Sequence, residues 1–145
     1  MIEYFYQAAT VWFLGFFPFF EIYVAVPAGM AFGLDPVSVV VFSVFGNFVP
    51  VLMIEYGYYW LIRFQRVRRW LLRRGSEKLH RNINKYGWWY IILITPWVGI
   101  WAIAVAAKVL RMNREMLIWG SLVSILLYAV VIVIGIQLGL DWFGE

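Results

Sequence analysis

The chain lacks residue types on which much protein chemistry depends. Among its 145 residues there is no cysteine and a single histidine, His80. The absence of cysteine excludes disulfides and thiolate chemistry. The remaining residues do not assemble into a serine–histidine–acid set, a metal-binding cluster or a glycine-rich phosphate loop. We therefore expect no enzyme activity, no catalytic residue, no metal and no cofactor.

Charged residues are scarce, and the basic ones are confined to one stretch. Only 14% of the residues are charged, and residues 1–62 and 115–145 contain no lysine or arginine. All twelve basic residues lie between Arg63 and Arg114. Such a cluster could bind nucleic acid, but its place between apolar segments favours the positive-inside pattern of a membrane protein. We expect residues 63–86 to be cytoplasmic and to lie against anionic lipid, with no nucleic-acid partner.

Apolar residues dominate the rest of the chain. They make up 64% of it, and aromatic residues alone make up 21%. A helical membrane span needs about 20 largely apolar residues. These runs predict a single all-α, multi-pass membrane domain over residues 1–145, in the cell (inner or plasma) membrane. Because residues 1–6 carry no lysine or arginine, the first helix is expected to be retained, not cleaved as a secretory signal. The runs that are long enough cover about 4–34, 37–62, 87–110 and 116–140.

Two of these runs are interrupted at positions 78 residues apart. Pro18 and Glu21, followed by Pro27, break the first run, and Pro96 and Gly99 break the third. Proline removes a helix donor and frees carbonyl groups that find no water inside a bilayer. Paired breaks in two halves are typical of a transporter whose site lies near the bilayer midplane. The sequence therefore predicts a substrate or proton site at these breaks.

Charge placement distinguishes two topologies for the broken runs. If each run crossed the membrane once, Lys108, Arg111 and Arg114 would emerge on the face opposite the basic connection, against the positive-inside pattern. If the broken runs are re-entrant hairpins, which enter and return on one face, all twelve basic residues share the cytoplasmic face. We therefore predict re-entrant hairpins, full crossings over 37–62 and 116–140, and both termini outside.

The two halves of the chain have the same order of elements. Asp35 before Pro36, and Asn113 before Arg114, each supply an N-cap side chain just ahead of a long apolar run. The sequence thus predicts two inverted repeats, each a broken re-entrant helical hairpin followed by a long transmembrane helix. The expected segments are repeat one at about 1–62, the basic cytoplasmic connection at about 63–86, and repeat two at about 87–140.

The residues around the breaks resemble a known family. They are Pro18-Phe-Phe-Glu21 with Pro27, Gly46-Asn47-x-x-Pro50 and Pro96-x-x-Gly99-x-Trp101. This set is similar to the small multidrug export family, a distant branch of the DedA-like membrane proteins. The resemblance implies two re-entrant hairpins that face each other from opposite sides, each followed by a transmembrane helix. It also implies a role in flipping or recycling isoprenoid carrier lipids and in membrane homeostasis.

Glu21 is the first candidate for the predicted site. A carboxylate inside the hydrocarbon costs several kcal/mol unless it is paired, protonated or hydrated. No basic residue precedes Arg63, so Glu21 is expected to pair with Lys108 of the other half or to exchange a proton. Lys108 suits a snorkelling position at the cytoplasmic face equally well. The alternative is that a neutral Glu21 bonds carbonyl groups freed by Pro18 or Pro27 and braces the hairpin.

Asn47 and Glu55 are further polar candidates on the second apolar run. They lie two helical turns apart, so their side chains share one face. With Glu21 and Lys108 they could line a polar path, although Gly46 and Asn47 suit a close contact between helices as well. Because Glu55 lies close in sequence to the basic connection, we expect it to occupy a hydrated position at the membrane surface.

Three functions fit these observations. The first is a DedA-like membrane transporter or lipid flippase with a midplane site between the hairpins, coupled to protons through Glu21. The second is a small multidrug exporter with four crossing helices that exchanges protons for drugs. The third is a non-transporting structural or assembly factor. Complete segregation of the basic residues favours the first over the second, because exporters that insert in both orientations need a weak bias.

The expected partners follow from the same functions. They are membrane lipid and a small-molecule or lipid-linked substrate. Two short hairpins and two full spans shield the polar groups of the site only partly from lipid. A homodimer that covers these groups is therefore a further candidate partner.

The topology can be tested with single cysteines, since the native chain has none. Cysteine placed at position 3, 35, 76, 113 or 143 would be probed in intact cells with an impermeant thiol reagent. Re-entrant hairpins predict labelling from outside at 3, 35 and 143 only. Labelling of position 113 from outside would instead indicate four single crossings.

Overall fold

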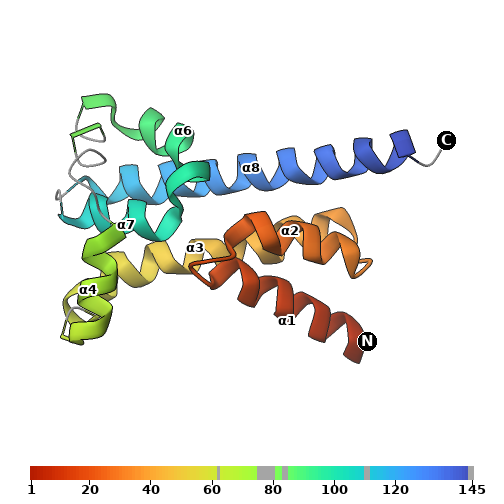
Figure 1. Ribbon diagram of the computed structural model, residues 1–145, viewed down its shortest axis with the longest axis horizontal. Helices are drawn as coiled ribbons and strands as arrows, with labels where there is room; N and C mark the ends of the chain where they lie inside the picture. The colour runs from red at the N-terminus through yellow and green to blue at the C-terminus, as the bar shows by residue number, and fades with distance from the viewer. Residues whose placement is uncertain (62, 75–80, 83–84, 110–111, 144–145) are drawn as a thin grey trace. The chain divides into compact units, whose positions relative to one another are not determined.

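The computed structural model describes residues 1–61, 63–74, 81–82, 85–109 and 112–143, and every regular element within these ranges is an α-helix. This confirms the all-α fold class. His80 and Arg111 lie outside the described residues. The helices, labelled in Figure 1, are α1 (Ile2–Phe16), α2 (Glu21–Ala31), α3 (Pro36–Leu61), α4 (Gln65–Arg74), α6 (Trp88–Val98), α7 (Ile100–Val109) and α8 (Arg114–Phe143).

The chain divides into two compact units. The first unit consists of Met1–Asn47 and Ile125–Glu145, and the second consists of Phe48–Ser124. Both long helices, α3 and α8, contribute one part to each unit. The unit boundaries therefore differ from those of the expected repeats, and each unit is described by itself.

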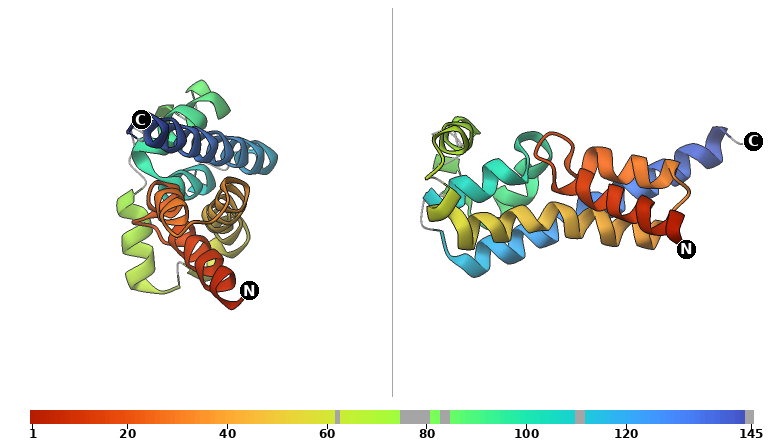
Figure 2. Two further views of the ribbon diagram at one scale, coloured as in Figure 1. Left: turned by 90° about the vertical axis from the view of Figure 1, so that its right-hand side faces the viewer. Right: turned by 90° about the horizontal axis from the view of Figure 1, so that it is seen from below.

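The first unit contains a helical hairpin. The helices α1 and α2 are joined by residues 17–20 and lie side by side in Figures 1 and 2. Gln7, early in α1, donates a hydrogen bond to the backbone oxygen of Phe32 at the end of α2 (3.1 Å), so the two helices are antiparallel. The break thus lies at Pro18, as expected. The expectation that Pro27 also interrupts the run is wrong: α2 continues through Pro27, which is exposed, and the opposite face of the helix is buried. Tertiary packing of that face offsets the cost of about 3 kcal/mol that proline has inside a helix.

The helix α3 begins with the predicted cap. The Oδ1 atom of Asp35 accepts a hydrogen bond from the backbone N–H of Ser38 (3.0 Å), and Pro36 is the first helical residue. Hydrogen bonds from the side chain and then the backbone of Ser38 hold the pKa of the Asp35 carboxyl below its ordinary value. The cap sets where the chain turns from the hairpin into the long helix.

In the first unit, α1 crosses the beginning of α3 at very short range. A Cβ atom at Gly46 would overlap the backbone oxygen of Trp12, and one at Gly15 would lie 2.7 Å from the backbone oxygen of Ser43. The two helices therefore touch backbone to backbone, which only glycine allows. This confirms the close helix contact that Gly46 suggested.

The second unit contains a second helical pair. The helices α6 and α7 are separated by Gly99 alone, with φ 86° and ψ 153°, a conformation that is essentially restricted to glycine. Pro96 lies inside the last turn of α6, and the N–H of Gly99 donates to the backbone oxygen of Thr95 (2.9 Å). The two helices fold on each other, since Ala106 of α7 packs against Tyr90, Ile94 and Val98 of α6.

Within the same unit, α7 is enclosed and α4 is basic. Residues 100–107 of α7 are all buried. The helix α4 contacts α7 and forms part of the basic connection. Its exposed arginines include Arg66, Arg68, Arg69 and Arg73.

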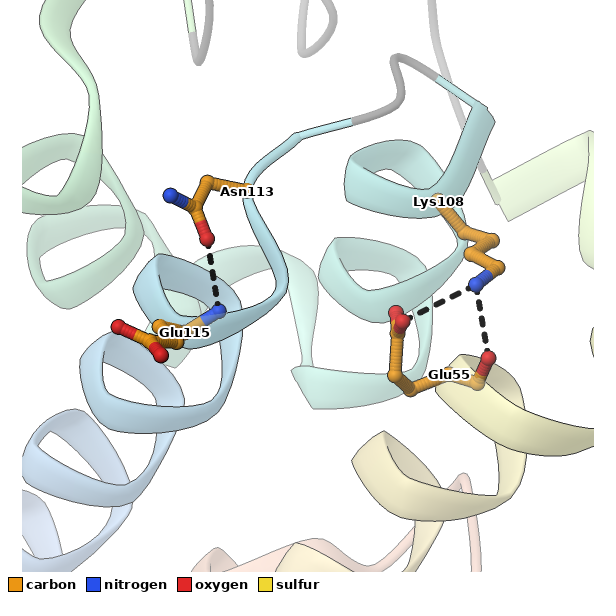
Figure 3. Close-up of polar contacts among 4 residues, drawn as sticks. All are labelled: Glu55, Lys108, Asn113 and Glu115. Carbon is orange, nitrogen blue, oxygen red and sulfur yellow. Dashed lines mark hydrogen bonds and ion pairs between the residues drawn. The ribbon is translucent and has the colours of Figure 1, made fainter.

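The helix α8 also begins with the predicted cap. The Oδ1 atom of Asn113 accepts a hydrogen bond from the backbone N–H of Glu115 (3.0 Å), as Figure 3 shows. Further along, the Ser124 hydroxyl donates to the backbone oxygen of Ile92 on α6 (3.4 Å). Asp35 and Asn113 thus perform the same task at equivalent positions of the two halves.

Two helices are long and apolar enough to cross a membrane. They cover Pro36–Leu61 and Arg114–Gly139, with mean hydropathies of 2.3 and 2.6. Each has 26 residues, or about 39 Å of helix, against about 30 Å of hydrocarbon. The helices α2, α6 and α7 have 10 or 11 residues, so each is roughly half as long as a span requires. That the hairpins are re-entrant and related by inverted symmetry stays a prediction.

The close crossing of α1 and α3 can be tested by adding one methyl group. Gly46→Ala should lower the free energy of unfolding by about 1–3 kcal/mol, because the backbones must separate to admit it. Gly57→Ala on the same helix is the matched control, since nothing lies within 4 Å of its added Cβ. Thermal unfolding of the purified protein in detergent measures both. Equal melting temperatures for the two variants would contradict a crossing this close.

Candidate functional site

Glu21 occupies a strained and buried position at the break of the first hairpin. It begins α2 with φ 50°, and it is the only non-glycine residue with positive φ among the residues that the structure describes. Its exposed fraction is 4%. A residue with a Cβ atom pays about 1–2 kcal/mol for the left-handed conformation, and such strain is concentrated at functional sites. The turn is closed by the N–H of Glu21, which donates to the backbone oxygen of Phe17 (3.1 Å).

The second hairpin contains glycine at the equivalent position. Gly99 lies 78 residues after Glu21, and it also has positive φ just before the second helix of its pair. The backbone therefore needs a left-handed residue at both breaks, and one half supplies it without strain. A turn alone does not require the carboxyl group of Glu21.

Asn47 is the second buried polar group of the first unit. It lies in α3 with an exposed fraction of 0%, next to the crossing of α1 and α3. Neither Nδ2 nor Oδ1 has a hydrogen-bond partner among the described residues. Burying a polar group without a partner is costly and rare in native structures. The amide of Asn47 is thus available to bind a polar group that enters this unit.

Tyr23 adds an aromatic hydroxyl near Glu21. It lies one half-turn further along α2, within electrostatic range of the Glu21 carboxylate and of Tyr128 on α8. Its buried hydroxyl has no hydrogen-bond partner among the described residues. Tyr23 was not predicted as a site residue, since an aromatic residue in an apolar run gives no signal of its own.

The residues predicted for the site do not all fall in one unit. Pro18, Glu21, Pro27 and Asn47 belong to the first, whereas Pro96 and Gly99, with Glu55 and Lys108, belong to the second. No group of three or more histidine, cysteine, aspartate or glutamate residues that could hold a metal ion occurs in the described part of the chain.

Glu55 and Lys108 form an ion pair within the second unit. The Nζ atom of Lys108 lies 3.1 Å from Oε1 of Glu55 and also donates to the backbone oxygen of Glu55 (2.7 Å), as Figure 3 shows. The exposed fractions of the side chains are 12% for Glu55 and 21% for Lys108. The pair connects α3 to the last turn of α7, where a cation is also favoured by the helix dipole.

This pair bears on two expectations. The side chain of Glu55 is mostly buried and paired with a lysine, and the hydrated position at the membrane surface expected for it stays a prediction. Lys108, for which Glu21 and a snorkelling position were both open, binds Glu55. The charge pattern predicts that both residues lie near the cytoplasmic face, but it does not indicate that they pair with each other. Which side chains would meet was decided by the packing of α7 against its neighbours.

The neighbouring residue of α3 holds another cation. The guanidinium of Arg114, at the start of α8, lies over the ring of Tyr56, 4.4 Å from its centre. Glu55 and Tyr56 therefore hold the residues that flank the connection between α7 and α8. Cation–π contacts of this kind contribute about 0.5–2 kcal/mol.

Comparison with known proteins provides a family assignment. The model of the family described as "Putative small multi-drug export protein" matches residues 21–132. The chain belongs to this family. The match begins at Glu21, the first residue of α2, and includes the break at Gly99 and most of α8. Neither the comparison with curated proteins nor the comparison with solved structures gives a match.

Family membership and the two long apolar helices together support a membrane location. The DedA-like part of the resemblance, the number of crossings and the orientation of the termini stay predictions.

The importance of the ion pair can be measured by removing its cation. Lys108→Met should lower the free energy of unfolding by about 1–3 kcal/mol, because it leaves the Glu55 carboxylate mostly buried and uncompensated. The double variant Glu55→Gln/Lys108→Met should recover part of this loss. Thermal unfolding in detergent provides the measurement.

The matched control for this experiment is Lys85→Met, which makes the same change at an exposed lysine. It should have little effect. If Lys108→Met is no more destabilising than Lys85→Met, the pair contributes nothing to stability.

Proposed function

We propose that the protein is a membrane transporter and that Glu21 takes part in its substrate or proton site. The observation that carries the proposal is the buried carboxyl group at a strained turn position which, in the other hairpin, is a glycine. Membership of the export family supports the transport function. In this proposal the substrate is a small molecule or a lipid-linked molecule.

The cost of Glu21 supports a functional role. Glycine at this position would adopt the same backbone conformation without strain. A residue that is strained where glycine would not be is typical of sites where the side chain is used, and acids inside apolar segments of membrane proteins are functional candidates. Tyr23, within electrostatic range of Glu21, and Asn47 belong to the same unit, and in this proposal their polar groups and Glu21 line the path of a proton or a polar substrate.

The finer form of the proposal has two re-entrant hairpins in inverted repeats, as in the DedA-like resemblance. Supporting it, Glu21 and Gly99 both have positive φ where the second helix of a hairpin begins, Glu21 as its first residue and Gly99 as the residue just before it. Asp35 and Asn113, also 78 residues apart, both cap a long helix. A lipid flippase and a proton-coupled transporter of small molecules are both compatible with this arrangement.

Two alternatives remain distinct from this proposal. A four-span exporter that exchanges protons for drugs would agree with the family description and would also use Glu21. A structural or assembly factor would need the hairpins but not the carboxyl group. Cysteine labelling of the topology distinguishes the four-span exporter from the proposed transporter. Substitution of Glu21 distinguishes the structural or assembly factor from it.

Two substitutions of Glu21 test the proposal in proteoliposomes. One assay follows ethidium driven by a pH gradient, and the other follows transfer of a fluorescently labelled phospholipid between leaflets. The wild-type protein should move at least one probe, and both Glu21→Gln and Glu21→Gly should slow it at least about tenfold. Glu21→Gly should at the same time raise the melting temperature, because it relieves about 1 kcal/mol of backbone strain.

Glu3→Gln, at an exposed acid of α1, is the control and should transport normally. Wild-type rates in Glu21→Gly would make Glu21 a brace of the hairpin. A wild-type protein that moves neither probe would favour the non-transporting alternative.

A further inference from the structure

A groove in the second unit combines aromatic rings with a carboxylate. It has a volume of about 380 Å³ and lies between the start of α6 and the first turns of α8. This is within the range of pockets that take small organic molecules. Its lining consists of Trp88, Asn113, Glu115, Met116, Trp119, Gly120 and Val123.

The aromatic walls of the groove are open to a ligand. Trp119 is 64% exposed and Trp88 is 38% exposed. Trp88 is stacked on Trp89, with ring centres 4.0 Å apart, so its ring is held in place by its neighbour. Gly120 lies at the floor of the groove close to α6, since a Cβ added there would be in ordinary contact with the Cβ of Trp88 at 3.6 Å. Tryptophan provides the most favourable ring face for a cation.

The carboxylate of Glu115 has no cation to neutralise it among the described residues. Its N–H is bonded to Asn113, and in Figure 3 its side chain points away from the Glu55–Lys108 pair. The nearby described cations of this unit are engaged elsewhere: Lys108 with Glu55, Arg114 over Tyr56 and Lys85 over Tyr86. Among the described residues that line the groove, Glu115 is the only charged one.

We propose that this groove binds a bulky organic cation, an ammonium or phosphonium ion with apolar substituents. The charge would lie against Glu115, and the apolar groups would lie against Trp88 and Trp119. A carboxylate beside exposed tryptophan faces fits such an ion better than it fits a neutral or anionic molecule. The proposal names a substrate class and rests on the proposed transport function, but binding in the groove does not require Glu21.

Binding can be measured on the full-length protein in detergent with radiolabelled tetraphenylphosphonium. Tetraphenylborate, an anion of the same shape, should not compete. Glu115→Gln should weaken binding about tenfold, and Trp119→Leu should weaken it about fivefold or more. The control is Trp97→Leu, which removes a tryptophan of α6 that is 84% exposed and lies outside the groove, and it should change the affinity less than about twofold.

Three outcomes would overturn the inference. They are unchanged binding in Glu115→Gln, equal losses in Trp97→Leu and Trp119→Leu, and tetraphenylborate binding as tight as that of the cation. Nanodiscs provide a further condition. If phosphatidylethanolamine, but not phosphatidylglycerol, blocks the probe, the groove is a site for a lipid headgroup and the inference also fails.

The same variants separate this inference from the proposed function. Binding that depends on Glu115 in a protein that transports neither ethidium nor lipid would contradict the transporter alone. Transport that depends on Glu21, together with unchanged binding in Glu115→Gln, would contradict the groove alone.

Discussion

The reversal of the chain within each short hairpin depends on a backbone conformation that L-residues avoid. Glu21 and Gly99 both have positive φ at the start of a helix. At Glu21 a turn of four residues precedes the reversal, and at Gly99 a single residue suffices. A sharp break leaves backbone groups that a bilayer cannot satisfy, so local hydrogen bonds must do so. The bonds to Phe17 and Thr95 from the N–H groups of Glu21 and Gly99 do part of this.

The rest of each unit is organised around these reversals by contacts of different kinds. In the first unit, glycine at positions 15 and 46 lets α1 touch α3 along the backbone, and Asp35 caps the helix that follows the hairpin. In the second unit, electrostatic contacts are added to the apolar packing of α6 against α7. Glu55 and Tyr56 hold Lys108 and Arg114 on either side of the connection from α7 to α8. The contacts that hold each hairpin within its unit thus differ between the two units.

Much of the plan was predictable because it depends on local rules. The breaks at Pro18 and at Gly99, the caps Asp35 and Asn113, and the two long helices follow from proline and glycine geometry, capping chemistry and hydrophobic length. Pro27 was mispredicted because packing of the buried face of α2, which the sequence does not show, offsets the cost of a proline inside the helix. For Glu55 the sequence indicated a neighbourhood of charges but could not identify Lys108 as its partner, since that requires the position of α7.

The sequence by itself determined that the protein is helical, that it suits a membrane, and where its helices begin and break. These properties are set by apolar length, by proline and glycine positions and by side chains that bond the adjacent backbone, all within a few residues of one another. Only the tertiary structure decided that Glu21 is strained and that Lys108 binds Glu55. It also decided that the buried amide of Asn47 has no hydrogen-bond partner among the described residues. It also brought Trp88 to the same groove as Glu115 and Trp119. The physical reason is that side chains far apart in sequence meet only after the helices pack, and burial and charge pairing are properties of that packing.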